Sequence, residues 1–377
     1  MDFELTDDQL ELQQVVRDIV AKECPTTLVR AIIGGDDDDA LWKTFVGLDW
    51  PGLAVGVEDG GTGLTEVELV ITLEELGWVA DPTPFLGTVG LYVPLVQACA
   101  TGPTRSELLQ AVVAGGTGTV AFAAESVRAT RSGDTGAMWS LSGTARSVVD
   151  GDRADRLAVV ATTDAGPAVF VVPGADVTAT RLTAMDPALH LADVVLDGVT
   201  VPADQVLGAD ADGIERAWQV AVIALSAEMV GASRRVLDLV LGHVRERQQF
   251  GVPIGSFQAV KHMAVDMYVA IERARVLVHF AELAIAEDDE RRALAASMAK
   301  VAAGECQRLV VKHGIQLFGG LGFTWENDLH LFARRAKVGD VLLGTTAWHR
   351  ARVARTTFAS LPPFPTPETS APGGVVR

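Results

Sequence analysis

Two short segments of the sequence combine residue types that bind phosphate groups. The first is Arg247-Gln248-Gln249-Phe250-Gly251, and the second runs from residue 316 to residue 322. A guanidinium such as that of Arg247 presents a planar fork of N–H donors to phosphate oxygens. Gly319 and Gly320 have no Cβ, so the backbone around them can approach a ligand closely. The two segments predict a site for a phosphate-bearing ligand, with these candidate contacts: Arg247, Phe250, Gly251, Gln258, Gln316, Gly319, Gly320 and Gly322.

Each segment also has a structural alternative when it is considered alone. Arg247 could be a cation at the C-terminus of a helix, where it would interact favourably with the helix dipole. Gly319-Gly320 could be an ordinary helix C-cap followed by a loop. The two segments are about 65 residues apart, by a count of the sequence, and both are expected at the ends of long helices. For Arg247 considered alone, the structural alternative is favoured.

The elements that must position these segments change type twice along the chain. Residues 1–112 show apolar residues at helical spacing and predict a helical domain. Residues 113–212 consist of short β-branched runs between turns and predict an antiparallel β domain. Residues 213–360 return to long helices, the last expected over 327–358, and predict a four-helix bundle. The tail, 361–377, is rich in Pro and Gly and is expected to be disordered. The fold class is therefore α+β, in the order helical domain, β domain, helical bundle.

Composition excludes several classes of function. The chain has 377 residues and a net charge of −18, which argues against nucleic acid or an anionic membrane as the main partner. Its three cysteines are far apart, and neither they nor the seven histidines show metal-ligand spacing, so no metal is expected. The acidic run 36–39 is interpreted as a solvated loop. No signal peptide and no membrane span are visible, so a cytoplasmic protein is expected.

Several motifs resemble the acyl-CoA dehydrogenase family over nearly the whole chain. In the N-terminal region these are residues 47–55, Glu58-Asp59-Gly60-Gly61-Thr62-Gly63-Leu64 and Glu74-Glu75-Leu76-Gly77. The most specific are Arg247-Gln248-Gln249-Phe250-Gly251, with Phe257-Gln258-Ala259-Val260 close behind, and Gln316-Leu317-Phe318-Gly319-Gly320-Leu321-Gly322.

The resemblance implies FAD as the cofactor and an acyl-CoA thioester as the substrate. In the family, the two specific motifs hold the ADP half of a FAD whose ring lies mainly in the adjoining subunit. The resemblance therefore implies an oligomer, either a homotetramer or a heterotetramer with a paralogous subunit, and an electron-transfer flavoprotein as the acceptor. Thr345, where the matching segment ends, joins the expected cofactor contacts.

The sequence departs from the family at the catalytic base. The family reaction is α,β-dehydrogenation, in which a carboxylate removes the α-proton of the thioester. The expected Glu, directly before Gly-Thr, is replaced by Leu343. The alternative Glu position on the first long helix of the bundle is occupied by Ala221. Asp340, one helical turn before Leu343, and Glu228, two turns after Ala221, are possible substitutes, although a structural role is favoured for both. The catalytic residue is therefore unknown from sequence.

The β domain departs from the family as well. Ser126 stands in place of a Pro, Ser147 in place of an aromatic residue and Val149 in place of a hydroxyl residue in the segments that flank the flavin ring. One hypothesis is a subunit of a heteromeric acyl-CoA dehydrogenase, similar to actinobacterial enzymes that act on steroid side-chain thioesters, with the base or ring site in the partner. The alternatives are a flavin oxidase or monooxygenase of the same fold, and a non-catalytic subunit that binds flavin or acyl-CoA.

Overall fold

The computed structural model describes residues 4–132, 137–208 and 210–358, so the predicted disordered tail lies outside the described residues. The described N-terminal part is helical. Its helices are α1 (Asp7–Glu23), α2 (Thr26–Ile33), α3 (Asp39–Gly47), α4 (Glu66–Val79), α5 (Val93–Cys99) and α6 (Gly102–Val113), with a π-helix at Leu86–Tyr92 before α5. α1 begins with a capping box, because Thr6 and Gln9 each accept a hydrogen bond from the other's backbone N–H.

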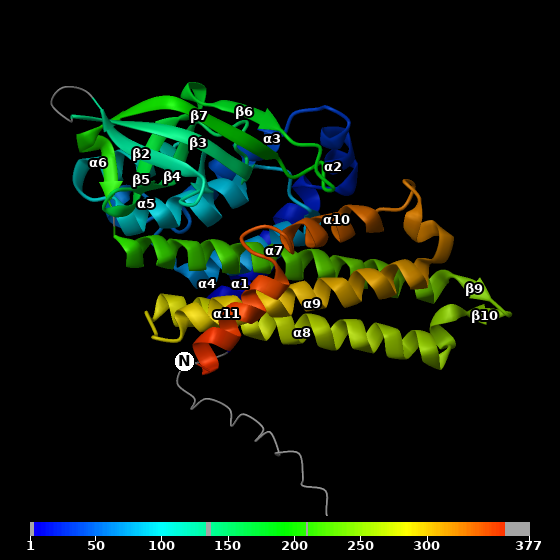
Figure 1. The fold of residues 1–377 in the computed structure, drawn as a ribbon. Helices are drawn as coiled ribbons and strands as arrows, with labels where there is room; N and C mark the ends of the chain where they lie inside the picture. Colours follow the sequence, from blue (N-terminus) through cyan, green and yellow to red (C-terminus); the bar gives the residue numbers. More distant parts are fainter. Residues whose placement is uncertain (1–3, 133–136, 209, 359–377) are drawn as a thin grey trace, which may run out of the picture.

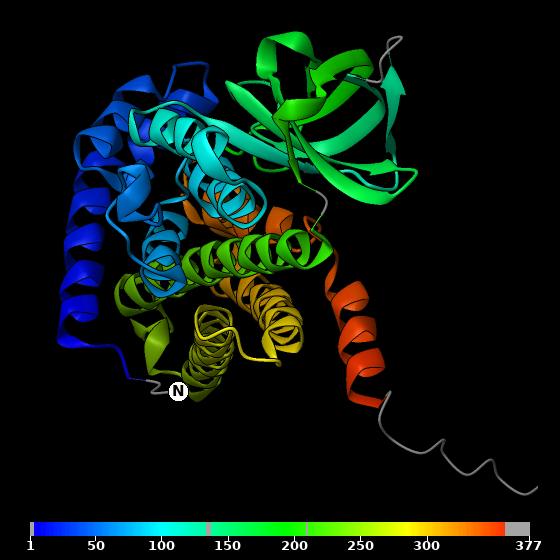
Figure 2. The same cartoon turned by 90° about the vertical axis from the view of Figure 1, so that its left-hand side faces the viewer.

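The middle part forms a twisted sheet that lies beside the N-terminal helices and above the long C-terminal helices in Figure 2. Its strands are β1 (Gly118–Phe122), β2 (Val127–Ser132), β3 (Met138–Val149), β4 (Arg156–Thr163), β5 (Gly166–Pro173), β6 (Thr178–Arg181), β7 (Leu191–Pro202) and β8 (Val206–Gly208). Within the described residues the strand order is β6-β7-β3-β2-β4-β5-β8, and β1 pairs with β4. The predicted antiparallel character holds for most pairs, but β4 pairs in parallel with both β1 and β2.

The C-terminal part is a bundle of long helices around α7 (Ala211–Glu246). A short hairpin of β9 (Gln248–Gln249) and β10 (Val252–Pro253) connects α7 to α8 (Gln258–Ala286). The chain continues through α9 (Arg292–Phe318), α10 (Leu329–Gly339) and α11 (Thr346–Phe358). Figure 1 shows the β9–β10 hairpin at one end of the bundle, on the same side as the connection from α9 to α10.

The expectation of one continuous helix over residues 327–358 was wrong. Leu343 and Gly344 have φ angles of 53° and 97°, in the left-handed region that cannot continue a right-handed helix. The chain therefore turns between α10 and α11, and Asp340 caps α10 instead of lying on a helical turn with Leu343. Before this turn, α10 packs on α7 and on α9.

α7 crosses α4 at very short distance, which fixes the helical N-terminal part onto the bundle. A Cβ added to Gly77 would lie 2.3 Å from the carbonyl oxygen of Glu228, and one added to Gly231 would lie 1.9 Å from that of Glu74. Only glycine permits this approach of the two backbones. Among the described residues, no helix combines the length and the apolar character needed to cross a membrane.

Candidate cofactor and catalytic sites

The first sequence motif folds into the hairpin at the end of α7. Gln249 pairs with Val252, so Phe250 and Gly251 alone form the turn. Both have positive φ, 54° and 79°, as a two-residue type I′ turn requires. The turn leaves the Phe250 side chain 92% exposed, next to the edge of the Phe257 ring at 6.0 Å. Arg247 caps α7 through its N–H, which donates to the carbonyl of His243, and its side chain is exposed.

The second motif forms the end of α9 and the 3₁₀ turn that follows it. Gly319 has a φ of 60°, and a Cβ added at Gly319 or Gly320 would meet no atom within 4 Å. The backbone is therefore open to a ligand at these two positions. Gly322 differs from them, because it is buried and its Cβ position lies 3.1 Å from the carbonyl oxygen of Ile315. Gln316 is exposed on the last turn of α9.

A ring contact joins the two motifs. The imidazole of His243 on α7 stacks on Phe318 at the end of α9, with centroids 4.3 Å apart. Burial, together with the nearby Arg247, lowers the pKa of His243, so the ring is neutral at physiological pH. Sequence reasoning assigned His243 no role, because nothing in the sequence shows which aromatic residue it faces. The contact places Arg247 and Gly319 at the same end of the bundle.

Exposed apolar side chains surround this end of the molecule. Phe323 is 80% exposed, Trp325 55% and Leu321 48%, in addition to Phe250. Gln258, at the first position of α8, is exposed beside them. A surface that combines open backbone, an exposed guanidinium and several large apolar side chains is typical of a binding interface.

The two positions where the family carries its base lie away from this end. Ala221 is 0% exposed inside α7 and has no ionisable group. Leu343 is half-buried in the turn between α10 and α11, where His349 Nε2 donates to its carbonyl at 3.0 Å. Thr345 is exposed, and its carbonyl accepts from the N–H of His349. The turn is thus firmly held, but it presents an aliphatic side chain.

Asp340 braces this turn. Its carboxylate accepts from Thr346 Oγ1 and lies 3.4 Å from the Lys337 ammonium. Burial would raise the pKa of Asp340, but the hydrogen bond from Thr346 and the nearby cations outweigh it, so the pKa is lowered. A carboxylate with a lowered pKa is a weak base near neutral pH. The geometry therefore favours a structural role for Asp340, with Lys300 supporting the same turn through the carbonyl of Gly339.

Glu228 lies in a buried ionic cluster where the three parts of the chain meet. Arg335 on α10 pairs with Asp186 of the β domain at 2.5 Å, and its Nη1 lies 3.7 Å from Glu228 Oε2. Burial raises the pKa of Glu228 to about 8, against the opposing effect of Arg335. Asp81, from the end of α4, is also fully buried, and its pKa is raised to about 6. The cluster joins the parts of the chain, and within the described residues Glu228 Oε2 accepts no hydrogen bond.

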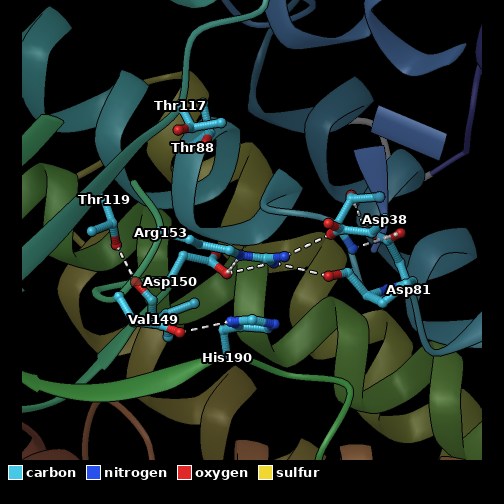
Figure 3. A network of polar contacts seen from close by, with 12 residues as sticks. Asp38, Asp81, Thr88, Thr117, Thr119, Val149, Asp150, Arg153 and His190 are labelled. Carbon is cyan, nitrogen blue, oxygen red and sulfur yellow. Dashed lines mark hydrogen bonds and ion pairs between the residues drawn. The ribbon is translucent and has the colours of Figure 1, made fainter. Parts of the chain in front are cut away.

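A second ionic network joins the β domain to the N-terminal part (Figure 3). Arg153 joins Asp150 of the β domain to Asp38 of the N-terminal part, with both contacts at 2.6 Å. Thr119 Oγ1 donates to the carbonyl of Val149. The acidic run at residues 36–39 is therefore not simply solvated, because Asp38 belongs to a domain junction. Ser147 is exposed, and its N–H donates to Asp193.

No group of three or more His, Cys, Asp or Glu side chains in the described ranges is arranged to hold a metal ion. Two cavities of about 320 and 330 Å³ are lined by other residues. The first lies between α4, α5 and the start of α7, and the second between α1, α4 and α8. In the part of the chain that the structure describes, neither of these two cavities is lined by Leu343 or Ala221.

The architecture is therefore two helical parts around one β sheet, with an exposed guanidinium and open glycine backbone at the end of the second helical part. The family models for the N-terminal and C-terminal domains of acyl-CoA dehydrogenase match residues 6–116 and 214–358. The chain belongs to the acyl-CoA dehydrogenase family. It is accordingly an FAD-dependent oxidoreductase of the class that acts on the CH–CH group of acyl-CoA thioesters.

Individual relatives agree with this assignment. The acyl-CoA dehydrogenase IpdE2 of Mycolicibacterium smegmatis is 30% identical over 345 residues, which cover 90% of this chain and 96% of the relative. The structure of the ChsE4–ChsE5 complex from Mycobacterium tuberculosis matches with a TM-score of 0.89 and 27% identity, over 96% of this chain and 100% of that chain. A variant of the Tcur3481–Tcur3483 steroid ACAD matches with a TM-score of 0.84 and 29% identity, over 94% and 98%.

Proposed function

We propose that this chain is one subunit of a heteromeric acyl-CoA dehydrogenase, which holds the diphosphate of FAD while a paralogous partner provides the catalytic base and the ring site. The supporting observation is an asymmetry within the chain. The surface at the ends of α7 and α9 is suited to bind phosphate, because it has an exposed Arg247 and open backbone at Gly319 and Gly320. Its two family base positions carry Leu343 and Ala221, which cannot accept a proton.

The residues at the end of the bundle fit the ADP half of FAD. The Arg247 guanidinium can donate two parallel hydrogen bonds to phosphate oxygens. Gly319 and Gly320 leave the space that a Cβ would fill, so backbone N–H groups can approach the diphosphate. Gln258 and Gln316 add exposed polar contacts, and the Phe250 ring supplies an apolar face. FAD supplies the acceptor of the β-hydride when it is bound.

Two features support a partner chain. Phe250, Phe323 and Trp325 are exposed around the proposed phosphate site, as expected of a surface that another subunit covers. The similar solved structures include two complexes of differently named chains, ChsE4–ChsE5 and Tcur3481–Tcur3483. The Tcur3481–Tcur3483 complex is described as a steroid ACAD. We extend this to a thioester with a bulky, steroid-derived acyl group as the substrate class. An electron-transfer flavoprotein as acceptor and a cytoplasmic location complete the proposal.

The test compares the chain alone with the chain co-expressed with a neighbouring paralogue. FAD content per chain and acyl-CoA oxidation should both rise strongly on co-expression. Arg247→Gln should weaken FAD binding about 10- to 100-fold, because hydrogen bonds to a charged group contribute about 1.5–3 kcal/mol. Arg245→Gln is the matched control, since Arg245 is an exposed cation on the same last turn of α7. It should leave FAD content unchanged.

Other results would contradict the proposal. One FAD per chain and an ordinary dehydrogenation rate for the chain alone would show that no partner is needed. A complex that stays colourless after FAD addition would indicate a subunit that has lost flavin. Rapid reaction of the reduced flavin with oxygen would indicate an oxidase or monooxygenase.

A further inference from the structure

The cavity between α1, α4 and α8 has apolar walls and one buried acid. Its volume is about 330 Å³, at the small end of the range for ligand sites. Leu5, Val70, Ile71, Val276 and Val278 supply the apolar lining. Val276 is 55% exposed, so this side chain lies at the mouth of the cavity. We call this site the Glu282 cavity, after the acid that lines it.

Glu282 has an unused acceptor in this cavity. Its side chain is 1% exposed. Oε1 contacts Nδ1 of His279, one turn earlier on α8, whereas Oε2 is buried and has no hydrogen-bond partner within the described residues. A buried polar atom without a partner costs free energy, so such atoms in native proteins usually meet water or a ligand.

The charges around Glu282 are predominantly negative. Glu74 on α4 is the nearest acid, and it is paired with Arg234 of α7 at 2.5 Å and with Arg275 of α8 at 3.3 Å. Arg234 also pairs with Glu75 at 2.5 Å, and Arg275, which lines the cavity, is the cation that Glu74 offsets there. Glu272 of α8 lines the cavity as well.

Two further acids, Glu66 and Glu68 at the start of α4, add to this negative field. Burial first, and then Glu74 and Glu68, raise the pKa of Glu282 well above its usual range, with Arg275 acting in the opposite direction. The raised pKa favours the protonated form of the Glu282 carboxyl in the free protein. Gln13, from α1, is the uncharged polar residue on the remaining wall.

We propose that the Glu282 cavity binds a primary alkylammonium group on a short apolar stem. The ammonium has three N–H donors and no acceptor, which matches the free Oε2 of Glu282. Glu74 and Glu272 attract a cation and repel a carboxylate or phosphate. The stem packs against Val70, Ile71 and Val276. A neutral alcohol would gain the hydrogen bond without the charge attraction.

Binding has a defined proton balance. The ligand enters as the ammonium ion, Glu282 loses its carboxyl proton to the buffer, and a carboxylate–ammonium pair forms. The ligand can be a free amine, or the lysine side chain of an associating protein chain, which has the same chemistry. The cavity lies about 36 Å along α8 from Gln258, from 24 residues at 1.5 Å each, and does not depend on FAD.

The test is calorimetric titration of the purified full chain with n-pentylamine, n-pentanol and pentanoate at neutral pH. Only the amine should bind saturably, and titration in two buffers of different ionisation heat should show release of about one proton. Glu282→Gln should lower amine affinity at least ~10-fold and abolish proton release. Glu290→Gln, which removes the same charge at an exposed position, should change neither quantity.

A second variant keeps the test independent of any folding effect of Glu282→Gln. Val276→Trp should block the mouth from the exposed face of α8 and abolish amine binding, with the melting temperature unchanged. The proposal is overturned if the amine does not bind, if it binds Glu282→Gln equally well, or if pentanol or pentanoate binds as tightly. Dissociation of an oligomer by both Glu282→Gln and the amine would assign the site to a lysine of an associating chain. Amine binding with an unchanged oligomeric state would assign it to a free amine.

Discussion

The imidazole of His243 lies nearly parallel to the ring of Phe318, with 14° between the planes and 4.3 Å between the centroids. Arg247 follows His243 by one helical turn, and Gly319 follows Phe318 directly. The contact therefore determines how far the proposed phosphate-binding guanidinium lies from the open glycine backbone. This contact between α7 and α9 fixes the relative position of two motifs that are distant in the sequence.

Replacing His243 should weaken FAD binding without unfolding the bundle. A stacked aromatic pair contributes about 0.5–1.5 kcal/mol beyond its buried area, so His243→Ala should lower FAD affinity up to about 10-fold. His243→Phe keeps a flat ring and should restore most of the loss. FAD retention of the co-expressed complex measures both, with His262→Ala at an exposed position of α8 as the control. Unchanged FAD retention in His243→Ala would show that the stack does not position the site.

Leu343 should be dispensable for the chemical step if the base comes from a partner. A positioned general base contributes about 10²–10⁴-fold to rate. Leu343→Ala should therefore leave kcat of the co-expressed complex within about 2-fold, because an aliphatic side chain cannot take up the α-proton. Steady-state kinetics and the pH profile check this. A fall of 100-fold, with FAD content unchanged, would mean that the turn between α10 and α11 lies at the reacting thioester.

The architecture could be predicted from sequence because it depends on local patterns. Apolar periodicity distinguishes α7, α8 and α9 from the β-branched runs of β1 to β8, and the motifs at residues 247–251 and 316–322 are contiguous. The capping box of Thr6 and Gln9 is also local, because it depends on two residues at a spacing of three.

Contacts between distant parts of the chain could not be predicted in the same way. Arg335 and Asp186 are 149 residues apart, and each alone resembles a surface charge. Asp38 lies in an acidic run that suggests solvent exposure, but it pairs with Arg153. The left-handed conformation of Leu343 is imposed by tertiary contacts, since leucine does not favour it locally. These contacts are where the sequence interpretation was incomplete.

The raised pKa of Glu228 predicts a pH-dependent stability with a definite sign. The folded protein keeps Glu228 protonated up to a pKa of about 8, whereas the unfolded chain ionises near the ordinary glutamate pKa of 4.5. Between these values the native state binds more protons, so this group makes stability fall as pH rises. Asp81 acts with the same sign and has a pKa of about 6, and the raised pKa of Glu282 adds in the same direction, so a substitution of Glu228 is needed to isolate its contribution.

Glu228→Gln should remove this effect. Because only the wild-type side chain ionises on unfolding, the stability advantage of the variant should grow from pH 6 to pH 8 by roughly 2 kcal/mol, from two pH units at about 1.4 kcal/mol each as an upper limit. Thermal melts at the two pH values measure the difference, with Glu290→Gln as the exposed control. Equal pH dependence in wild type and variant would mean that Glu228 is ionised, with Arg335 as its stable partner.

The crossing of α4 and α7 should be the most sensitive helix contact to added volume. A Cβ at Gly231 would lie 1.9 Å from the backbone carbonyl oxygen of Glu74. Neither atom can move away by a side-chain rotation. Overpacking of this kind typically costs 1–3 kcal/mol and occasionally more, so Gly231→Ala should lower the melting temperature clearly.

Gly242→Ala provides the matched control on the same helix. A Cβ at Gly242 meets no atom within 4 Å, and alanine is favoured over glycine in a helix by about 0.8–1.0 kcal/mol. This variant should therefore be slightly more stable than the wild type. Opposite shifts for the two substitutions would attribute the loss at Gly231 to the helix crossing, because helix propensity alone predicts a gain at both positions. A gain in both variants would instead show that α4 can move away from α7 at little cost.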